Sequence, residues 1–154
     1  FNQRIKSVGI HDCGGAIACL IPFLDPSRIW LGGGYTTYSM PQICRVVIGF
    51  HEARHTEVAN NFWRHALCPT PFKDENGQDV RSLVSGLLMA GQDACDESPI
   101  GSYGVEAILF KNIEKHCSSC SGKVRMDAGL YGDDVYKRIV GTAAVKALRG
   151  DLYQ

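Results

Sequence analysis

The segment His51-Glu52-Ala53-Arg54-His55 constrains this chain more than any other stretch of its sequence. The residues before it predict a buried helix, because apolar side chains recur at helical spacing and Pro41 stands where a first helical residue is tolerated. These apolar residues are Ile43, Val46, Val47 and Phe50. Positions i and i+4 of a helix lie on one face, so His51 and His55 can reach the same metal ion. We expect the helix to run to about Val58 and to end in a turn at Asn60-Asn61.

A catalytic zinc site needs three protein ligands, and this motif supplies two of them. His65 is the nearest candidate for the third, because it follows His55 by ten residues and the intervening asparagines can turn the chain back. The competing candidates are Glu106, Asp96 and Glu97. A helix-borne carboxylate favours Glu106, whereas the short loop favours His65, which we prefer. The sequence therefore predicts a Zn²⁺ site made by His51, His55 and His65.

Glu52 is the candidate general base. It stands beside the first histidine of the motif, where it can accept a proton from a water on the metal and pass that proton to a leaving amine. The alternative is that Glu52 only pairs with a basic neighbour such as Arg54. The first interpretation predicts a zinc-dependent hydrolase, with a peptide or protein as substrate and the metal as its only cofactor.

The motif resembles the signature of the zincin-type metallopeptidases, and the resemblance implies a zincin-like fold and a catalytic zinc. Two charged residues, Arg54 and Glu57, stand where that family usually has uncharged or hydrophobic ones. The middle third of the chain is similar to an uncharacterised group of bacterial proteins that share four short motifs. These motifs are H-E-A-R-H-T, H-x-x-C, A-C-D and G-[AS]-Y-G, and they stand here at 51–56, 65–68, 94–96 and 101–104. This second resemblance supports His65 over Glu106 as a ligand. By analogy with zincins, Tyr103 could stabilise an oxyanion, although packing is the more common role of a buried tyrosine.

Seven cysteines are many for a chain of 154 residues. Their spacing predicts two local disulfides, Cys13–Cys19 and Cys117–Cys120, with Cys68–Cys95 as a long-range candidate. Cys44 lies in the apolar run before the motif, so we expect it to be the free, buried thiol. The competing hypothesis is that Cys117 and Cys120 form half of a structural zinc site. Disulfides indicate an oxidising compartment, and we therefore expect a secreted or periplasmic protein.

The remaining sequence predicts an α+β fold, in which a small N-terminal sheet packs on three or four helices within a single domain spanning 1–154. Strands are expected at 5–10, 16–23 and 28–31, and the segment 35–38 is expected to be an edge strand, a flap or a loop. Further helices are expected at 80–88, from Ser98-Pro99 to about His116, and from Asp133 or Asp134 to Gly150.

The charge balance excludes some partners. Sixteen basic and sixteen acidic residues give a formal net charge of zero, which is not the charge distribution of a nucleic-acid-binding protein. No apolar run approaches the roughly 20 residues that a membrane span requires. The chain begins at Phe1 rather than Met, so we expect it to be a piece of a longer precursor.

The alternative function is a disulfide-stabilised binding or virulence-type module whose metal is structural or absent. The sequence does not predict an oligomeric state.

Overall fold

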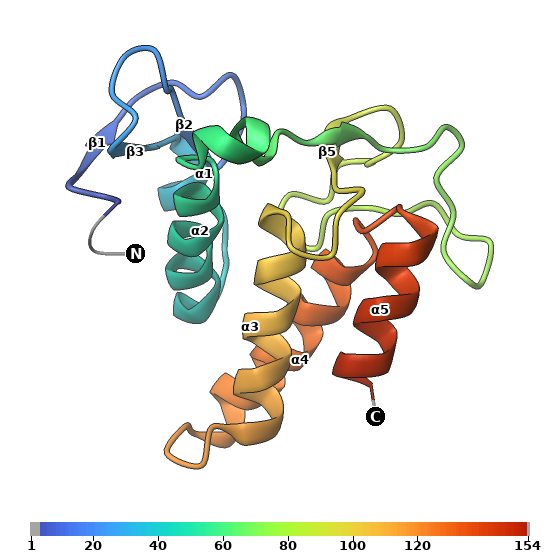
Figure 1. Cartoon of the computed structure of the whole chain (residues 1–154). Helices are drawn as coiled ribbons and strands as arrows, with labels where there is room; N and C mark the ends of the chain where they lie inside the picture. Colours follow the sequence, from blue (N-terminus) through green and yellow to red (C-terminus); the bar gives the residue numbers. More distant parts are fainter. Residues whose placement is uncertain (1–3, 154) are drawn as a thin grey trace. The chain divides into compact units, whose positions relative to one another are not determined.

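A computed structural model describes residues 4–153 of the chain. It is a mixed α+β structure with small sheets and several helices, which confirms the predicted fold class. The chain divides into two compact units, Phe1–Trp63 and Arg64–Gln154, and each is described by itself (Figure 1). Within residues 4–153, none of the helices has both the length and the apolar character needed to cross a membrane.

The first unit contains a three-stranded sheet with the order β1-β3-β2. Strand β1 (Ser7–Ile10) runs parallel to β3 (Arg28–Leu31), and β3 pairs antiparallel with β2 (Ala18–Leu20). All three strands lie inside the predicted ranges. The predicted Cys13–Cys19 disulfide is present and closes the turn that leads into β2.

A short helix, α1 (Gly33–Thr37), begins at the second of the three glycines, so the predictions of an edge strand or a loop at 35–38 were wrong. Local hydrogen bonds explain the difference. The hydroxyl groups of Thr36 and Thr37 both donate to the carbonyl oxygen of Gly33, and the N–H of Tyr38 donates to Gly34. Hydrogen bonds between residues three and four positions apart close a helical turn and cannot form within an extended strand.

Helix α2 (Gln42–Arg54) carries the histidine motif at its C-terminal end and packs on β2 and β3 of the same unit. Pro41 is the N-cap residue of this helix, whereas the sequence predicted it as the first helical residue. The helix ends at Arg54 rather than near Val58, because the hydroxyl of Thr56 donates to the carbonyl of Ala53 and closes a turn. A 3₁₀ segment, η1 (Val58–Trp63), then completes the unit.

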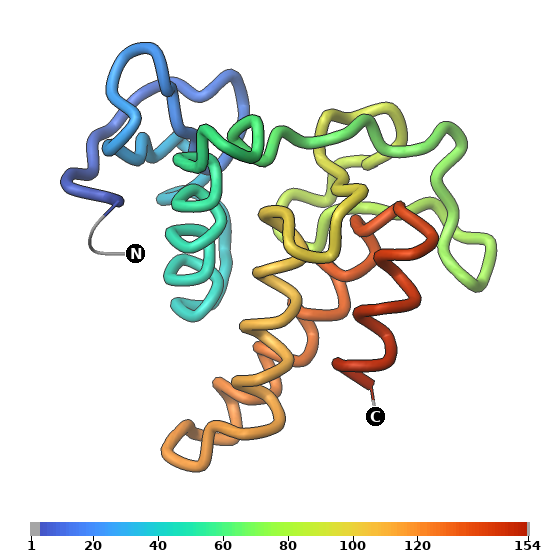
Figure 2. Tube along the Cα trace, viewed as in Figure 1, coloured from blue at the N-terminus to red at the C-terminus, as the bar shows by residue number. Residues whose placement is uncertain are grey.

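The second unit begins with a long irregular segment, which the trace in Figure 2 follows between β4 (Ala66–Leu67) and β5 (Asp93–Cys95). The predicted helix at 80–88 is wrong. Val80 instead bonds to two other segments: its N–H donates to the carbonyl of Phe72, and its carbonyl accepts from the N–H of Met89. These three residues form a small core with the Cys68–Cys95 disulfide.

Three helices complete this unit: α3 (Ser102–His116), α4 (Gly122–Tyr136) and α5 (Thr142–Leu152). Helices α3 and α4 pack against each other, and the predicted Cys117–Cys120 disulfide lies in the turn between them. The prediction of one final helix from Asp133 was wrong, because residues 122–136 and 142–152 form two separate helices. Helix α3 begins four residues later than Ser98, with Gly101 as its N-cap residue.

Candidate metal site

Helix α2 presents His51 and His55 on one face, one turn apart, as the motif predicts. Their ring centroids lie 5.0 Å apart and the rings meet edge to face. His51 continues a buried stripe that includes Cys44 and Val47, and the adjacent Glu52 is only 5% exposed. Both an imidazole and a carboxylate are therefore held away from bulk water at the end of this helix.

The Nδ1 atom of His55 lies 2.7 Å from the carbonyl oxygen of Phe62. A carbonyl can only accept, so the imidazole donates its Nδ1–H, and Nε2 is the nitrogen through which His55 would bind a metal. Three consecutive non-glycine residues, Asn61, Phe62 and Trp63, bring this carbonyl back towards the helix with positive φ angles of 50°, 59° and 47°. Such conformations cost about 1–3 kcal/mol each, so surrounding contacts must hold the turn.

Glu57 supplies those contacts. Its carboxylate accepts from Trp63 Nε1 at 2.6 Å and from the Arg54 guanidinium at 2.5 Å, and the guanidinium also lies over the Trp63 ring. Burial opposes ionisation of Glu57, but the Trp63 hydrogen bond and the charge of Arg54 outweigh it and lower the pKa of the carboxyl. The two charged residues that depart from the zincin pattern thus stabilise the turn that follows the motif.

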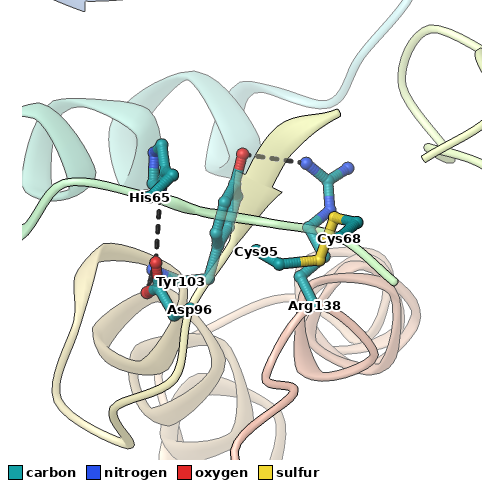
Figure 3. Close-up of a disulfide and its surroundings, with 6 residues drawn as sticks. All are labelled: His65, Cys68, Cys95, Asp96, Tyr103 and Arg138. Atoms are coloured by element: carbon teal, nitrogen blue, oxygen red, sulfur yellow. Dashed lines mark hydrogen bonds and ion pairs between the residues drawn. A yellow bond between two sulfur atoms is a disulfide. The ribbon is translucent and has the colours of Figure 1, made fainter. Parts of the chain in front are cut away.

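His65 is oriented by residues of the second unit (Figure 3). Its Nδ1 atom lies 2.9 Å from Asp96 Oδ1, and its ring stacks on Tyr103 with centroids 4.7 Å apart and an interplanar angle of 29°. As with His55, a protein acceptor at Nδ1 makes Nε2 the nitrogen through which His65 would bind a metal.

The three histidines form a group that could hold a metal ion. His51, His55 and His65 each offer one ring nitrogen, and these atoms lie within 4.8 Å of one another. His51 is buried, and the other two are half-buried. The same three residues were predicted as the ligands from the sequence, with His65 preferred over the carboxylates.

The competing carboxylates have other positions. Asp96 is 3% exposed and uses both of its oxygens within its own unit, accepting from His65 and from the backbone N–H of Tyr103. Glu106 is buried on α3, and Glu97 is exposed. Asp96 therefore contacts one histidine of the group without belonging to the group. Its position after Cys95 in the sequence does not indicate this contact.

Tyr103 stacks on His65 through its ring, and its hydroxyl accepts a hydrogen bond of 3.0 Å from Arg138. Burial raises the pKa of Tyr103 to about 12, although the positive charge of Arg138 opposes this shift. The hydroxyl therefore keeps its proton at neutral pH, as an oxyanion donor must. Its catalytic role stays a prediction. Sequence reasoning missed Arg138, which is 9% exposed and lies between the apolar residues Val135 and Ile139.

Comparison with known proteins adds no family to this geometry. A scan of family models, a search of curated proteins and a search of solved structures each return no match to this chain.

Proposed function

We propose that this protein is a zinc-dependent hydrolase, specifically a metallopeptidase that cleaves peptides or proteins. The observation that carries the proposal is the group of three imidazoles with ring nitrogens within 4.8 Å of one another, next to the buried carboxylate of Glu52. Three neutral nitrogen ligands and an adjacent carboxylate are the donor set of catalytic zinc sites.

The residues fit a zinc ion in their chemistry, since imidazole nitrogen is a common zinc ligand. Two of the three imidazoles have their Nδ1 atoms engaged by protein acceptors, the carbonyl of Phe62 and the carboxylate of Asp96. Such hydrogen bonds fix the tautomer and the ring orientation of metal-binding histidines. Three protein ligands also differ from the closed, four-ligand set that is typical of structural zinc.

Zinc bound in this group would act as a Lewis acid and lower the pKa of a coordinated water to about 7. Glu52 is the base in this proposal: its carboxylate takes the proton of the attacking water and delivers it to the leaving amine. Tyr103, which keeps its proton at neutral pH, donates a hydrogen bond to the carbonyl oxygen of the peptide as negative charge develops on it.

The three disulfides are compatible with an extracellular or periplasmic protein. We propose that the enzyme is secreted or periplasmic, because the reducing cytosol rarely maintains structural disulfides.

The Glu52→Gln variant tests the function. We expect it to bind one zinc ion per chain, as the wild type does, and to cleave labelled casein at least about 100-fold more slowly, since a general base contributes about 10²- to 10⁴-fold. Zinc content is measured by atomic absorption, and cleavage by fluorescence release. The matched control is Glu97→Gln, which changes an exposed carboxylate.

Two outcomes contradict the proposal. If Glu52→Gln retains zinc and full activity, Glu52 is not the base. If the wild type binds zinc but cleaves neither casein nor short amide substrates, the metal is structural and the protein is a binding module.

A further inference from the structure

We propose that Asp96 is a positioning residue for the metal group, because it fixes which nitrogen of His65 faces the ion and how the ring is held. The inference rests on the proposed function, since it requires that His65 binds a metal. It adds a residue that lies outside the ligand set and on a different segment of the chain, 31 positions from His65.

Each oxygen of the Asp96 carboxylate makes one hydrogen bond. Oδ1 lies 2.9 Å from Nδ1 of His65, and Oδ2 accepts from the backbone N–H of Tyr103 at 2.7 Å. A carboxylate oxygen accepts, so Nδ1 of His65 donates in this contact and Nε2 is the nitrogen left to bind the ion. Because Tyr103 lies in the first turn of α3, Asp96 accepts from one of the N–H groups that have no partner within the helix.

The backbone of Asp96 is fixed from both sides. Its N–H donates to the carbonyl of Arg138 and its carbonyl accepts from Val140, each at 2.8 Å. The residue before it, Cys95, pairs with Ala66 in the β4-β5 ladder and forms the disulfide with Cys68. His65 directly precedes Ala66, so the ladder and the disulfide hold the two segments together one step away from the His65–Asp96 contact (Figure 3).

The face of the His65 ring is fixed as well as its edge. Tyr103 stacks on the ring, and Arg138 holds Tyr103 through its hydroxyl while its guanidinium lies 4.8 Å from the centre of the tyrosine ring. Arg138 is itself held by the buried Asp134 at 3.4 Å. With both edge and face constrained, His65 loses little rotational freedom when it binds an ion, and such preorganisation increases affinity.

The test is the zinc affinity of Asp96→Asn, measured by competition with a chromophoric chelator. We expect an affinity about 10- to 100-fold weaker than that of the wild type, because the amide is neutral and can present a donor to Nδ1 in place of the carboxylate. The matched control is Asp93→Asn, an exposed change on β5, the strand that ends one residue before Asp96; this variant should bind zinc as the wild type does. His65→Ala should weaken binding at least as much as Asp96→Asn.

Each result decides one question. If Asp96→Asn binds zinc like the wild type while His65→Ala does not, the positioning role is wrong and the proposed function stands. If His65→Ala binds normally, His65 is no ligand and the inference falls. If the wild type itself binds no zinc, the proposed function fails first.

A second measurement does not depend on the folding of a variant. Nitrogen-15 NMR of the metal-free wild type, recorded at increasing pH until the imidazole signals no longer move, reports the tautomer of His65. We expect the hydrogen on Nδ1. A hydrogen on Nε2 would overturn the inference, even if Asp96→Asn fails to fold.

Discussion

Lys111 is the clearest case of a charge that the fold must accommodate, since only 4% of this residue is exposed. Its ammonium contacts Asp133 at 2.6 Å and Glu114 at 3.0 Å and lies over the ring of Tyr153. Burial opposes the charge, but these carboxylates outweigh it and raise the pKa of Lys111 above its usual value of 10.5. We expect Lys111→Met to lower the free energy of unfolding by about 1–2 kcal/mol at neutral pH, because both carboxylates are partly solvated.

The pH dependence of that loss follows from the sign of the shift. A raised pKa in the folded state stabilises fully below the unfolded value and ceases to do so as the pH rises through the folded value. The difference between wild type and variant should therefore be constant up to about pH 10 and shrink above it, as measured by urea denaturation. Lys115→Met, an exposed change on the same helix, is the control. A difference that stays constant to about pH 12 would contradict this account.

At the scale of elements, the close packing of α3 on α4 depends on Gly132. A Cβ at this position would lie 3.1 Å from the Cβ of Phe110, which is 2% exposed. Gly132→Val should lower the free energy of unfolding by about 1–3 kcal/mol, because the two helices must move apart. Gly122→Ala, in the first turn of α4 with open space around it, should instead raise that energy by about 0.5 kcal/mol. Urea denaturation followed by circular dichroism measures both, and equal stability of Gly132→Val and the wild type would contradict the prediction.

These glycines also explain why the sequence predicted some helices and not others. Apolar periodicity located α2, and the capping signal at Ser98-Pro99 located most of α3. Apolar periodicity failed for α4, because Gly122, Gly129 and Gly132 are residues that indicate turns in a sequence. In the structure, Gly132 instead allows α3 and α4 to pack closely. Apolar periodicity failed in the opposite direction at 80–88, where a helical pattern is overridden by the hydrogen bonds of Val80 to Phe72 and Met89 and by Gly86 with a φ of +72°.

The candidate site was predictable to the extent that its chemistry is local. The i, i+4 spacing predicted His51 and His55, and a short turn predicted His65. The role of Asp96 depends on the β4-β5 pairing and on a disulfide across 27 positions, neither of which a local pattern specifies. Arg138 contacts Tyr103 from 35 positions away, so its burial could not be predicted from its neighbours in sequence.

For the whole molecule, the three disulfides leave one thiol, Cys44, which is 3% exposed. We expect Ellman's reagent to detect no fast-reacting thiol in the native protein, one per chain in urea, and all seven after reduction. Mass spectrometry after alkylation in urea should place the single label on Cys44. Three thiols in the unreduced, unfolded chain would show that one disulfide is open and would revive a metal-binding role for Cys117 and Cys120.

All three histidines of the metal group lie within residues 51–65, and the turn at Asn61–Trp63 lies between the second and the third of them. An ion held there would close loops of four and ten residues only, and the entropy lost in closing a loop is smallest when the loop is short. The strained turn also fixes much of the backbone of this segment before an ion binds, because the conformational free energy of the turn is spent when the chain folds. In the proposed function, the segment would therefore act as a compact chelating peptide that binds its ion with little further restriction of the chain.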